Sequence, residues 1–317
     1  MGATWDWHDL SELSEEERDE RVQELAQANI DEPFDFHQGP LLRALLMKTG
    51  PETSVICVCA SHLVCDGLSL EIVSEDIAAF YTGIVQGRWM ERPPVPALSD
   101  YTAALAELEE SGDVEEARDY WKSVYGETVP PDLDLPLDRP RPRRRSFRGG
   151  RLSYYLDSEL NEPMRAFARE SGCTAFVLML SVYELMLSRL SGQDDIVVGI
   201  PAAGQPYVGI SNLVTHAVSF LPLRTRIDTT SSFKALMLKV HEGFLDAKDR
   251  QSCGYGEILK ELTLPRDPSR LPLVTASFNM DMAYNPLDFD GELARFVSAP
   301  RGLSKYDLLF TLTDEGE

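Results

Sequence analysis

The sequence contains no hydrophobic run that approaches the length of about 18 residues needed to cross a bilayer. No secretory leader precedes the first acidic stretch, and we therefore expect a cytoplasmic protein that does not bind membranes. Positive charge is also scarce, because 30 Lys and Arg residues stand against 52 Asp and Glu residues, a formal net charge of −22 at pH 7. This balance argues against nucleic acids and anionic membrane surfaces as partners.

Cysteine is rare, and its count is odd, so disulfide bonds could not use every thiol. The cysteines lie mostly in apolar runs, which indicates reduced, buried thiols of a cytoplasmic protein. They are Cys57, Cys59, Cys65, Cys173 and Cys253. No C-x-x-C pair and no histidine cluster completes a metal site, and we expect no bound metal. The G-x-S-x-G motif of serine hydrolases is absent as well.

The most informative segment that is present runs from Val55 to Ile84. The short, unalternating apolar run 55–60 predicts a strand buried on both faces. Apolar residues then recur at helical spacing over 70–84, which predicts an amphipathic helix. His62, Asp66 and Gly67 are therefore expected on a tight strand-to-helix turn. In such a turn, a glycine permits backbone angles that a Cβ atom resists.

A histidine on such a turn is well placed for proton transfer. The strand holds its backbone, and the nearby helix N-terminus favours the neutral imidazole ring, which can accept a proton. Asp66, four residues after His62, could hold the turn or orient the ring. A single histidine is more often structural than catalytic, so this interpretation needs support from the rest of the chain.

Residues 61–69, SHLVCDGLS, resemble the HHxxxDGxS signature of condensation domains from nonribosomal peptide synthetases. These domains belong to the chloramphenicol-acetyltransferase-like acyltransferases. The resemblance implies that His62 is the catalytic residue, and it gives structural roles at the active site to Ser61, Asp66 and Gly67. Ser61 stands where the family usually has its first histidine. Ser69, Ser219 and Arg224 are expected to line the substrate cleft that the family has between its two lobes.

Further segments resemble the family in the same order along the chain. They are PFDFHQGPLLR (33–43), YW (120–121) with LPLDRPRP (135–142), DIVVGIPAAGQ (195–205), LVTHAVSFLPLR (213–224), GYGEILKEL (254–262) with PRDPSRLPLVTASFNM (265–280), and SKYDL (304–308). Gln205 replaces an arginine of the family pattern, and Ser219 replaces an asparagine. His216 occupies a usually apolar position, and we expect it to be a strand residue, not a second base. His37 is expected in a loop.

The resemblance implies an α/β fold of the chloramphenicol-acetyltransferase type, in which two related two-layer α+β lobes meet at a V-shaped cleft. We expect residues 1–146 to hold what remains of the first lobe and residues 147–317 most of the second. The family pattern also has an opening strand, a long helix and an arginine-bearing RHExLRT segment before Trp5, and closing elements after Thr313. The chain is therefore expected to be incomplete at both ends, poorly soluble and inactive on its own.

Local patterns predict the individual elements. Ser14 and Glu17 form a capping box that predicts a helix to about Asn29. The Pro- and Arg-rich segment 139–148 is expected to be an extended connector between the lobes. The remaining predictions are strands at 41–48, 151–156 and 196–201, and helices at 101–108, 114–125, 161–170, from Thr174 to Leu190 and from Ser232.

The resemblance implies amide-bond formation between substrates carried on the 4′-phosphopantetheine arms of carrier proteins. One arm brings an acyl or peptidyl thioester, and the other brings an aminoacyl acceptor whose amine His62 would orient or deprotonate. The partners would be peptidyl or acyl carrier proteins and adjacent synthetase domains, and the domain itself would bind no cofactor. The alternative is a non-catalytic docking or recruitment module, which Ser61 and the absent segments favour. A heterocyclisation domain would have aspartate at position 61, and a plant-type acyl-CoA transferase would carry DFGWG; neither is present.

Overall fold

The computed structural model describes residues 4–89, 94–126, 128–282, 286–297 and 302–314. The chain forms two compact units. Unit 1 contains Met1–Leu98, Asn212–Ala217 and Tyr284–Ala299, and unit 2 contains Ser99–Ser211, Val218–Ala283 and Pro300–Glu317. This division differs from the predicted one at residue 146, because Trp121 and Tyr125 are buried in the core of unit 2. The cleft between the predicted lobes stays a prediction.

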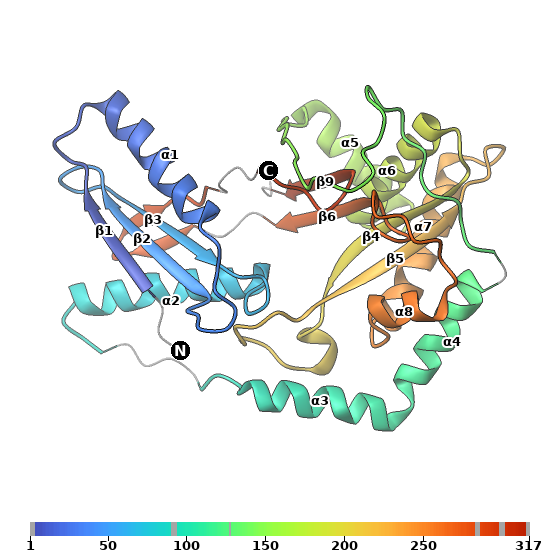
Figure 1. The fold of residues 1–317 in the computed structure, drawn as a ribbon, viewed down its shortest axis with the longest axis horizontal. Helices are drawn as coiled ribbons and strands as arrows, with labels where there is room; N and C mark the ends of the chain where they lie inside the picture. Colours follow the sequence, from blue (N-terminus) through green and yellow to red (C-terminus); the bar gives the residue numbers. More distant parts are fainter. Residues whose placement is uncertain (1–3, 90–93, 127, 283–285, 298–301, 315–317) are drawn as a thin grey trace. The chain divides into compact units, whose positions relative to one another are not determined.

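Unit 1 is built on a three-stranded sheet in the order β1-β2-β3. The strands are β1 (Thr4–Asp9), β2 (Leu42–Lys48) and β3 (Ser54–Ala60), with β1 parallel and β3 antiparallel to β2. Helix α1 (Glu15–Asp31) lies along one face of this sheet and packs on Leu45 and Met47 (Figure 1). The predicted capping box of Ser14 and Glu17 is confirmed at the start of α1.

The prediction that the 55–60 strand is buried on both faces is wrong. Val55 and Ile56 remain 37% and 43% exposed. The reason is the position of β3, which is the last strand in the described sheet, while α1 packs on only one face. Strand β1 was not predicted, although its sequence alternates aromatic and polar residues.

The face of this sheet opposite to α1 carries large, partly exposed apolar side chains. Trp7, Leu46 and Ile56 lie in one cross-strand row, and Trp5 and Trp7 are 69% and 52% exposed. We therefore expect the chain, expressed alone, to aggregate, because the repulsion from its net charge is screened over about 10 Å in ordinary salt and apolar contact is not. Size-exclusion chromatography and thermal unfolding test this expectation. A monomer with one sharp unfolding transition and condensation activity would contradict it.

Helix α2 (Gly67–Val85) also belongs to unit 1 and receives a hairpin from late in the sequence. The hairpin pairs β7 (Leu287–Phe289) with β8 (Glu292–Ala294) through Asp290 and Gly291, whose φ angles of 59° and 93° suit a tight hairpin turn. The rings of Tyr81 and Phe289 lie 5.4 Å apart, and the Asp290 amide donates to Thr82 Oγ1 at 3.0 Å. The hairpin therefore packs against the second half of α2, at Tyr81 and Thr82.

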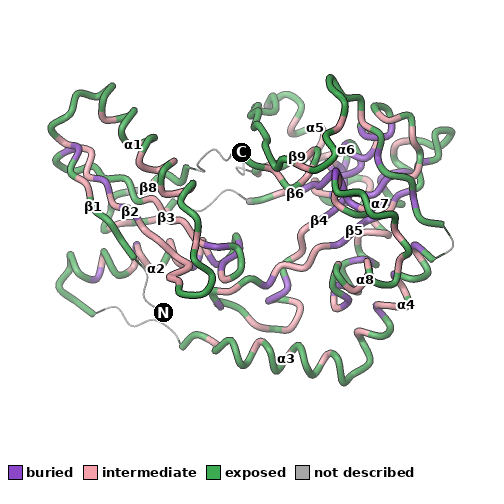
Figure 2. The backbone as a smooth tube through the Cα atoms, viewed as in Figure 1, coloured by how far each residue is buried: buried purple, intermediate pink, exposed green. Residues whose placement is uncertain are grey.

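Unit 2 contains a four-stranded sheet in the order β5-β4-β6-β9. Its strands are β4 (Asp195–Ala203), β5 (Val218–Arg226), β6 (Ala276–Met282) and β9 (Leu308–Asp314). Its helices are α3 (Leu98–Ser111), α4 (Asp113–Tyr125), α5 (Ser158–Glu170), α6 (Ala175–Ser191), α7 (Phe233–Asp249), α8 (Tyr255–Glu261) and the 3₁₀ turn η1 (Pro206–Val208). Buried residues gather on α6, α7, β4 and β5 (Figure 2).

The arginine-rich segment after α4 packs within unit 2 and does not act as the predicted connector. Arg141 forms a bidentate ion pair with Asp307, at 3.0 and 2.5 Å. The Arg145 amide donates to the carbonyl of Pro268. The predicted strand at 151–156 is also wrong: these residues have no regular secondary structure, and Tyr154 and Tyr155 are exposed. Alternating apolar residues form a strand only where a neighbouring strand accepts their backbone hydrogen bonds.

Helix α6 confirms the prediction of a strongly apolar helix capped by Thr174, whose hydroxyl accepts from the Val177 amide at 3.3 Å. Gly192 ends it with a φ of 71°. Among the described helices, none by itself is long and apolar enough to cross a bilayer, whereas Glu159–Glu170 and Ala175–Ser191 satisfy that test only as a pair, bent by 104° at the break between them.

Helix α6 also carries a buried acid, Glu184, inside the core of unit 2. Burial raises the pKa of this carboxyl from 4.5 to about 8, although the Thr225 hydroxyl donates to it at 3.1 Å. The folded chain therefore keeps the proton, while the unfolded chain releases it near pH 4.5. Folding then binds a proton between these two pH values, so stability is lost as the pH rises through this window.

We expect Glu184→Gln to flatten this pH dependence, because glutamine keeps the acceptor for Thr225 and cannot ionise. As the pH rises from 5 to 8, the unfolding free energy of wild type should fall by up to about 1.4 kcal/mol per pH unit more than that of the variant. Denaturant unfolding at several pH values between 5 and 8 measures the slope. Glu107→Gln, on the exposed helix α3 of the same unit, is the matched control. Identical slopes for wild type and Glu184→Gln would contradict the expectation.

Candidate active site

The turn between β3 and α2 is held by its first residue, Ser61. The Ser61 amide donates to the Leu41 carbonyl at 2.9 Å, and its own carbonyl accepts from the Val64 amide at 3.1 Å. The buried Ser61 hydroxyl accepts from the Leu63 amide at 3.3 Å. Ser61 therefore fixes the start of the turn, and the exposed His62 that follows it projects from a fixed backbone.

Asp66 ends the turn as the N-cap of α2 and is buried. One carboxylate oxygen, Oδ1, accepts from the Ser69 amide at 2.9 Å and lies 2.7 Å from the Ser69 hydroxyl. The other oxygen, Oδ2, accepts from the Ala217 amide at 3.0 Å. Asp66 therefore joins three features of unit 1: the turn, the N-terminus of α2, and the distant segment 212–217.

The expectation that Gly67 relieves strain in the turn is wrong. Gly67 is the first residue of α2, and it is not among the glycines with positive φ. The bend is made by Asp66, whose backbone is extended with φ of −109° and ψ of −170°. A Cβ atom at Gly67 would have no heavy atom of the described residues within 4 Å. The lack of a side chain at Gly67 therefore leaves open space beside the turn.

His216 lies in the irregular segment just before β5, so its predicted place in a strand is wrong. Its ring contacts the ring of His62, with centroids 4.8 Å apart and planes at 85°. Both histidines are exposed and both belong to unit 1. This contact was missed because nothing in a sequence shows that position 216 returns to position 62. His37 lies in a turn, as predicted.

The three residues expected to line the cleft lie in different settings. Ser69 is completely buried, and its hydroxyl accepts from the Thr215 amide at 3.0 Å and lies 2.7 Å from the Thr215 carbonyl. It therefore fastens the turn and, as placed, cannot reach a substrate. Ser219, on β5 in unit 2, contacts the Gln251 carbonyl at 3.5 Å, and its place in a cleft stays a prediction.

Arg224, the third of these residues, is tied into unit 2. Its guanidinium pairs with Asp195 at 2.9 and 2.6 Å and donates to the carbonyls of Val124 and Thr128 at 2.8 Å each. These bonds, with the hydroxyl of Thr225 on the opposite face of β5, hold β5 to its neighbours. The Asp195 hydrogen bond raises the pKa of Arg224, so the guanidinium stays charged. A cleft-lining role for Arg224 stays a prediction.

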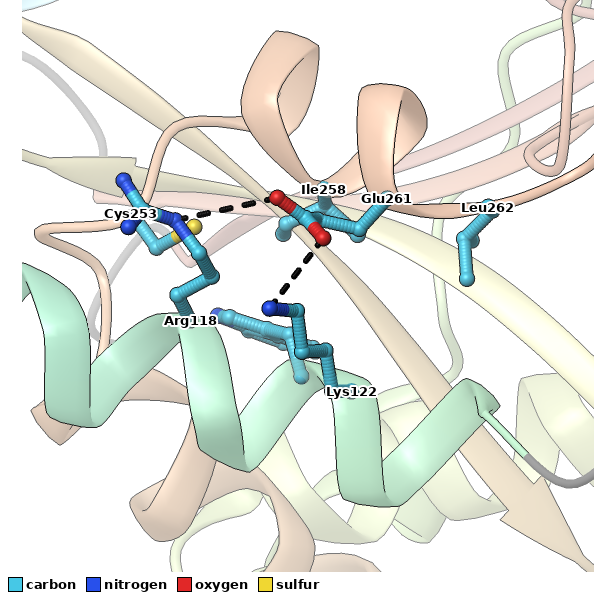
Figure 3. Close-up of a pocket in the computed structure, with 7 residues that line it drawn as sticks. Arg118, Lys122, Cys253, Ile258, Glu261 and Leu262 are labelled. Carbon is cyan, nitrogen blue, oxygen red and sulfur yellow. Dashed lines mark ion pairs between the residues drawn. The ribbon is translucent and has the colours of Figure 1, made fainter.

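A second feature, a pocket in unit 2, does not resemble a reaction centre. It lies between α4 and α8 and is lined by Arg118, Trp121, Lys122, Cys253, Ile258, Glu261 and Leu262 (Figure 3). Arg118 and Lys122 both form ion pairs with Glu261, at 3.9 and 3.2 Å, so the charged side chains of the pocket neutralise one another. Burial raises the pKa of the Cys253 thiol to about 11, which keeps it unreactive. Within the described ranges, no group of three or more His, Cys, Asp or Glu side chains could hold a metal ion.

Comparisons with known proteins identify the family to which the chain with this turn belongs. A family model described as the condensation domain matches residues 2–317. A linear gramicidin synthase protein of Brevibacillus parabrevis is 32% identical over 312 residues, which cover 96% of this chain and 4% of that protein. A plipastatin synthase protein of Bacillus subtilis (strain 168) is 36% identical over 299 residues, which cover 91% of this chain and 11% of that protein. The chain thus spans a small part of these curated relatives.

A solved structure shows the same fold. The first condensation domain of the calcium-dependent antibiotic synthetase, in complex with a substrate analogue, is similar with a TM-score of 0.76 and 21% identity, over 98% of this chain and 68% of that chain. The predicted fold class, α/β of the chloramphenicol-acetyltransferase type, is confirmed.

The chain belongs to the condensation-domain family. Condensation domains of nonribosomal peptide synthetases are acyltransferases that form amide bonds between substrates carried on phosphopantetheine. The matches favour this activity over the docking-module alternative.

Proposed function

We propose that this chain joins a carrier-bound acyl or peptidyl thioester to a carrier-bound aminoacyl amine, with His62 as the catalytic residue. The observation that carries the proposal is the place of His62: an exposed imidazole on a turn whose two ends are fixed, in a chain that matches the family model over 2–317. Ser61 and Asp66 act through the backbone of the turn and not on the substrate.

The reaction makes one bond and breaks one. The lone pair of the acceptor amine attacks the thioester carbonyl carbon, a C–N bond forms, and the C–S bond breaks. The amine gives up one proton, and the leaving phosphopantetheine thiolate takes up one, so the products are an amide and a free thiol. His62 orients the amine or carries this proton, and holding both arms in one site supplies much of the rate.

The turn supports this role because it holds the base, His62, at a fixed place while the carrier-bound substrate moves. The backbone on both sides of His62 is hydrogen-bonded, so only the imidazole needs to adjust to the amine. The five free cysteines support the cytoplasm as the compartment, since thiols persist there in the reduced form.

A condensation assay with loaded carriers tests the proposal. One carrier protein bears an acyl thioester and the other an aminoacyl thioester, and the chain is supplied within its full reading frame. Mass spectrometry should find the amide on the acceptor carrier, and omission of the chain should remove it. Carriers that bind the chain and yield no amide would contradict the proposal and support the docking-module alternative.

A further inference from the structure

His216 reaches His62 from a segment that the active-site turn holds at two points. The Thr215 amide donates to Ser69 Oγ at 3.0 Å, and the Ala217 amide donates to Asp66 Oδ2 at 3.0 Å. These two residues flank His216 directly. Asp66, which caps α2, and Ser69, which is hydrogen-bonded to Asp66, therefore also fix the backbone that carries the second imidazole.

The ring contact is specific in its geometry. The centroids of His62 and His216 lie 4.8 Å apart, with the ring planes at 85°, so that one ring presents its edge to the face of the other. This is a favoured arrangement for aromatic pairs. A pair of two imidazoles is also too small a donor set for a structural metal site, which takes four ligands.

An edge contact limits the orientations of a histidine ring. The terminal torsion of histidine is broad, so an exposed imidazole samples many ring orientations unless a neighbour restricts them. Aromatic pairs at this geometry change the relative population of one orientation by about two- to tenfold. A base must hold one ring nitrogen toward the proton that it accepts, so this restriction matters for catalysis.

We propose that His216 is a positioning residue, whose ring holds the His62 imidazole in the orientation used for condensation. The kinetic part of this inference rests on the proposed function, whereas the ring contact does not. Because the role belongs to the ring and not to its nitrogens, an aromatic residue without a titratable group should fulfil it.

Two substitutions separate positioning from a chemical role. His216→Ala removes the ring and should lower kcat by about two- to tenfold with KM unchanged, because substrate binding does not depend on ring orientation. His216→Phe keeps an aromatic edge and should restore kcat to within about twofold of wild type. His37→Ala, an exposed histidine in a turn of the same unit, is the matched control and should change neither constant.

A measurement without turnover tests the contact itself. The Cε1–Hε1 resonance of His62, identified by its loss in His62→Ala, should shift in His216→Ala because the ring current of His216 disappears. His216→Phe should retain a ring-current shift. A His62 resonance that does not move in His216→Ala would overturn the inference. A shifted resonance in a wild-type protein that forms no amide would support the contact and overturn the proposed function alone.

The kinetic outcomes also decide against the inference in two cases. If His216→Phe is as slow as His216→Ala, then a nitrogen of His216 takes part in the chemistry and the positioning role is wrong. If neither substitution lowers kcat, then the contact has no part in catalysis.

Discussion

His62→Ala is expected to lower the rate of amide formation by about two to four decades, the usual contribution of one acid–base group. The fold should remain intact, because the side chain is exposed and the turn is held by the backbone and by Ser61 and Asp66. Single-turnover assays with loaded carriers measure the rate, and thermal unfolding measures stability. The protein is supplied within its full reading frame.

The control for this substitution is His37→Ala, which removes an exposed histidine from a different turn of the same unit. It should leave both the rate and the melting temperature unchanged. Turnover by His62→Ala at the wild-type rate would show that another group does the work assigned to His62. A large fall in melting temperature would instead show that the imidazole supports the fold.

Asp66→Asn is expected to lower the melting temperature and the activity together. Asparagine can still accept from the Ser69 amide, but its NH₂ group would then face the Ala217 amide, and two donors cannot bond. Losing a buried hydrogen bond to a charged acceptor costs about 1.5–3 kcal/mol. The segment that carries His216 would be released at the same time. Denaturant unfolding and the carrier assay measure the two effects.

Asp35→Asn provides the comparison for Asp66→Asn. Asp35 Oδ1 also accepts backbone amides, those of His37 and Gln38 at 2.8 and 3.1 Å, but it lies in an exposed turn where water can replace the lost acceptor. Its substitution should cost much less. An Asp66→Asn protein that is fully stable and inactive would argue for a direct chemical role of the carboxylate.

Elements with local signals could be predicted from the sequence. Ser14, Thr174 and Ser232 each cap a helix at the predicted residue, since a cap depends only on a side chain and the next three amides. The strand-turn-helix around His62 was predicted for the same reason, because its apolar run, polar turn and helical repeat are contiguous. Its resemblance to a family signature then led to the prediction that His62 is catalytic, which local physics alone does not make and which stays a prediction.

Features that depend on distant chain segments could not be predicted in this way. The boundary of the first unit falls near Leu98 and not at 146, because Trp121 and Tyr125 find their partners far along the chain, at the carbonyls of Arg250 and Pro222. The contact of His62 with His216 likewise depends on a segment that is distant in sequence and close in the fold. Gly67 was misjudged because a glycine beside a turn indicates strain only when its φ is positive.

Unit 1 is assembled from three stretches of chain, and this order has a consequence for synthesis on the ribosome. The acceptor Asp66 and its donor Ala217 are 151 positions apart in sequence. At about 5–20 residues per second, the nascent chain needs roughly 8–30 seconds to supply that donor. During this interval Asp66 can cap α2 but has no Ala217 amide to bind, and His62 has no ring beside it. The candidate active site is therefore completed late in translation, only after the core strand β4 of the other unit has been made.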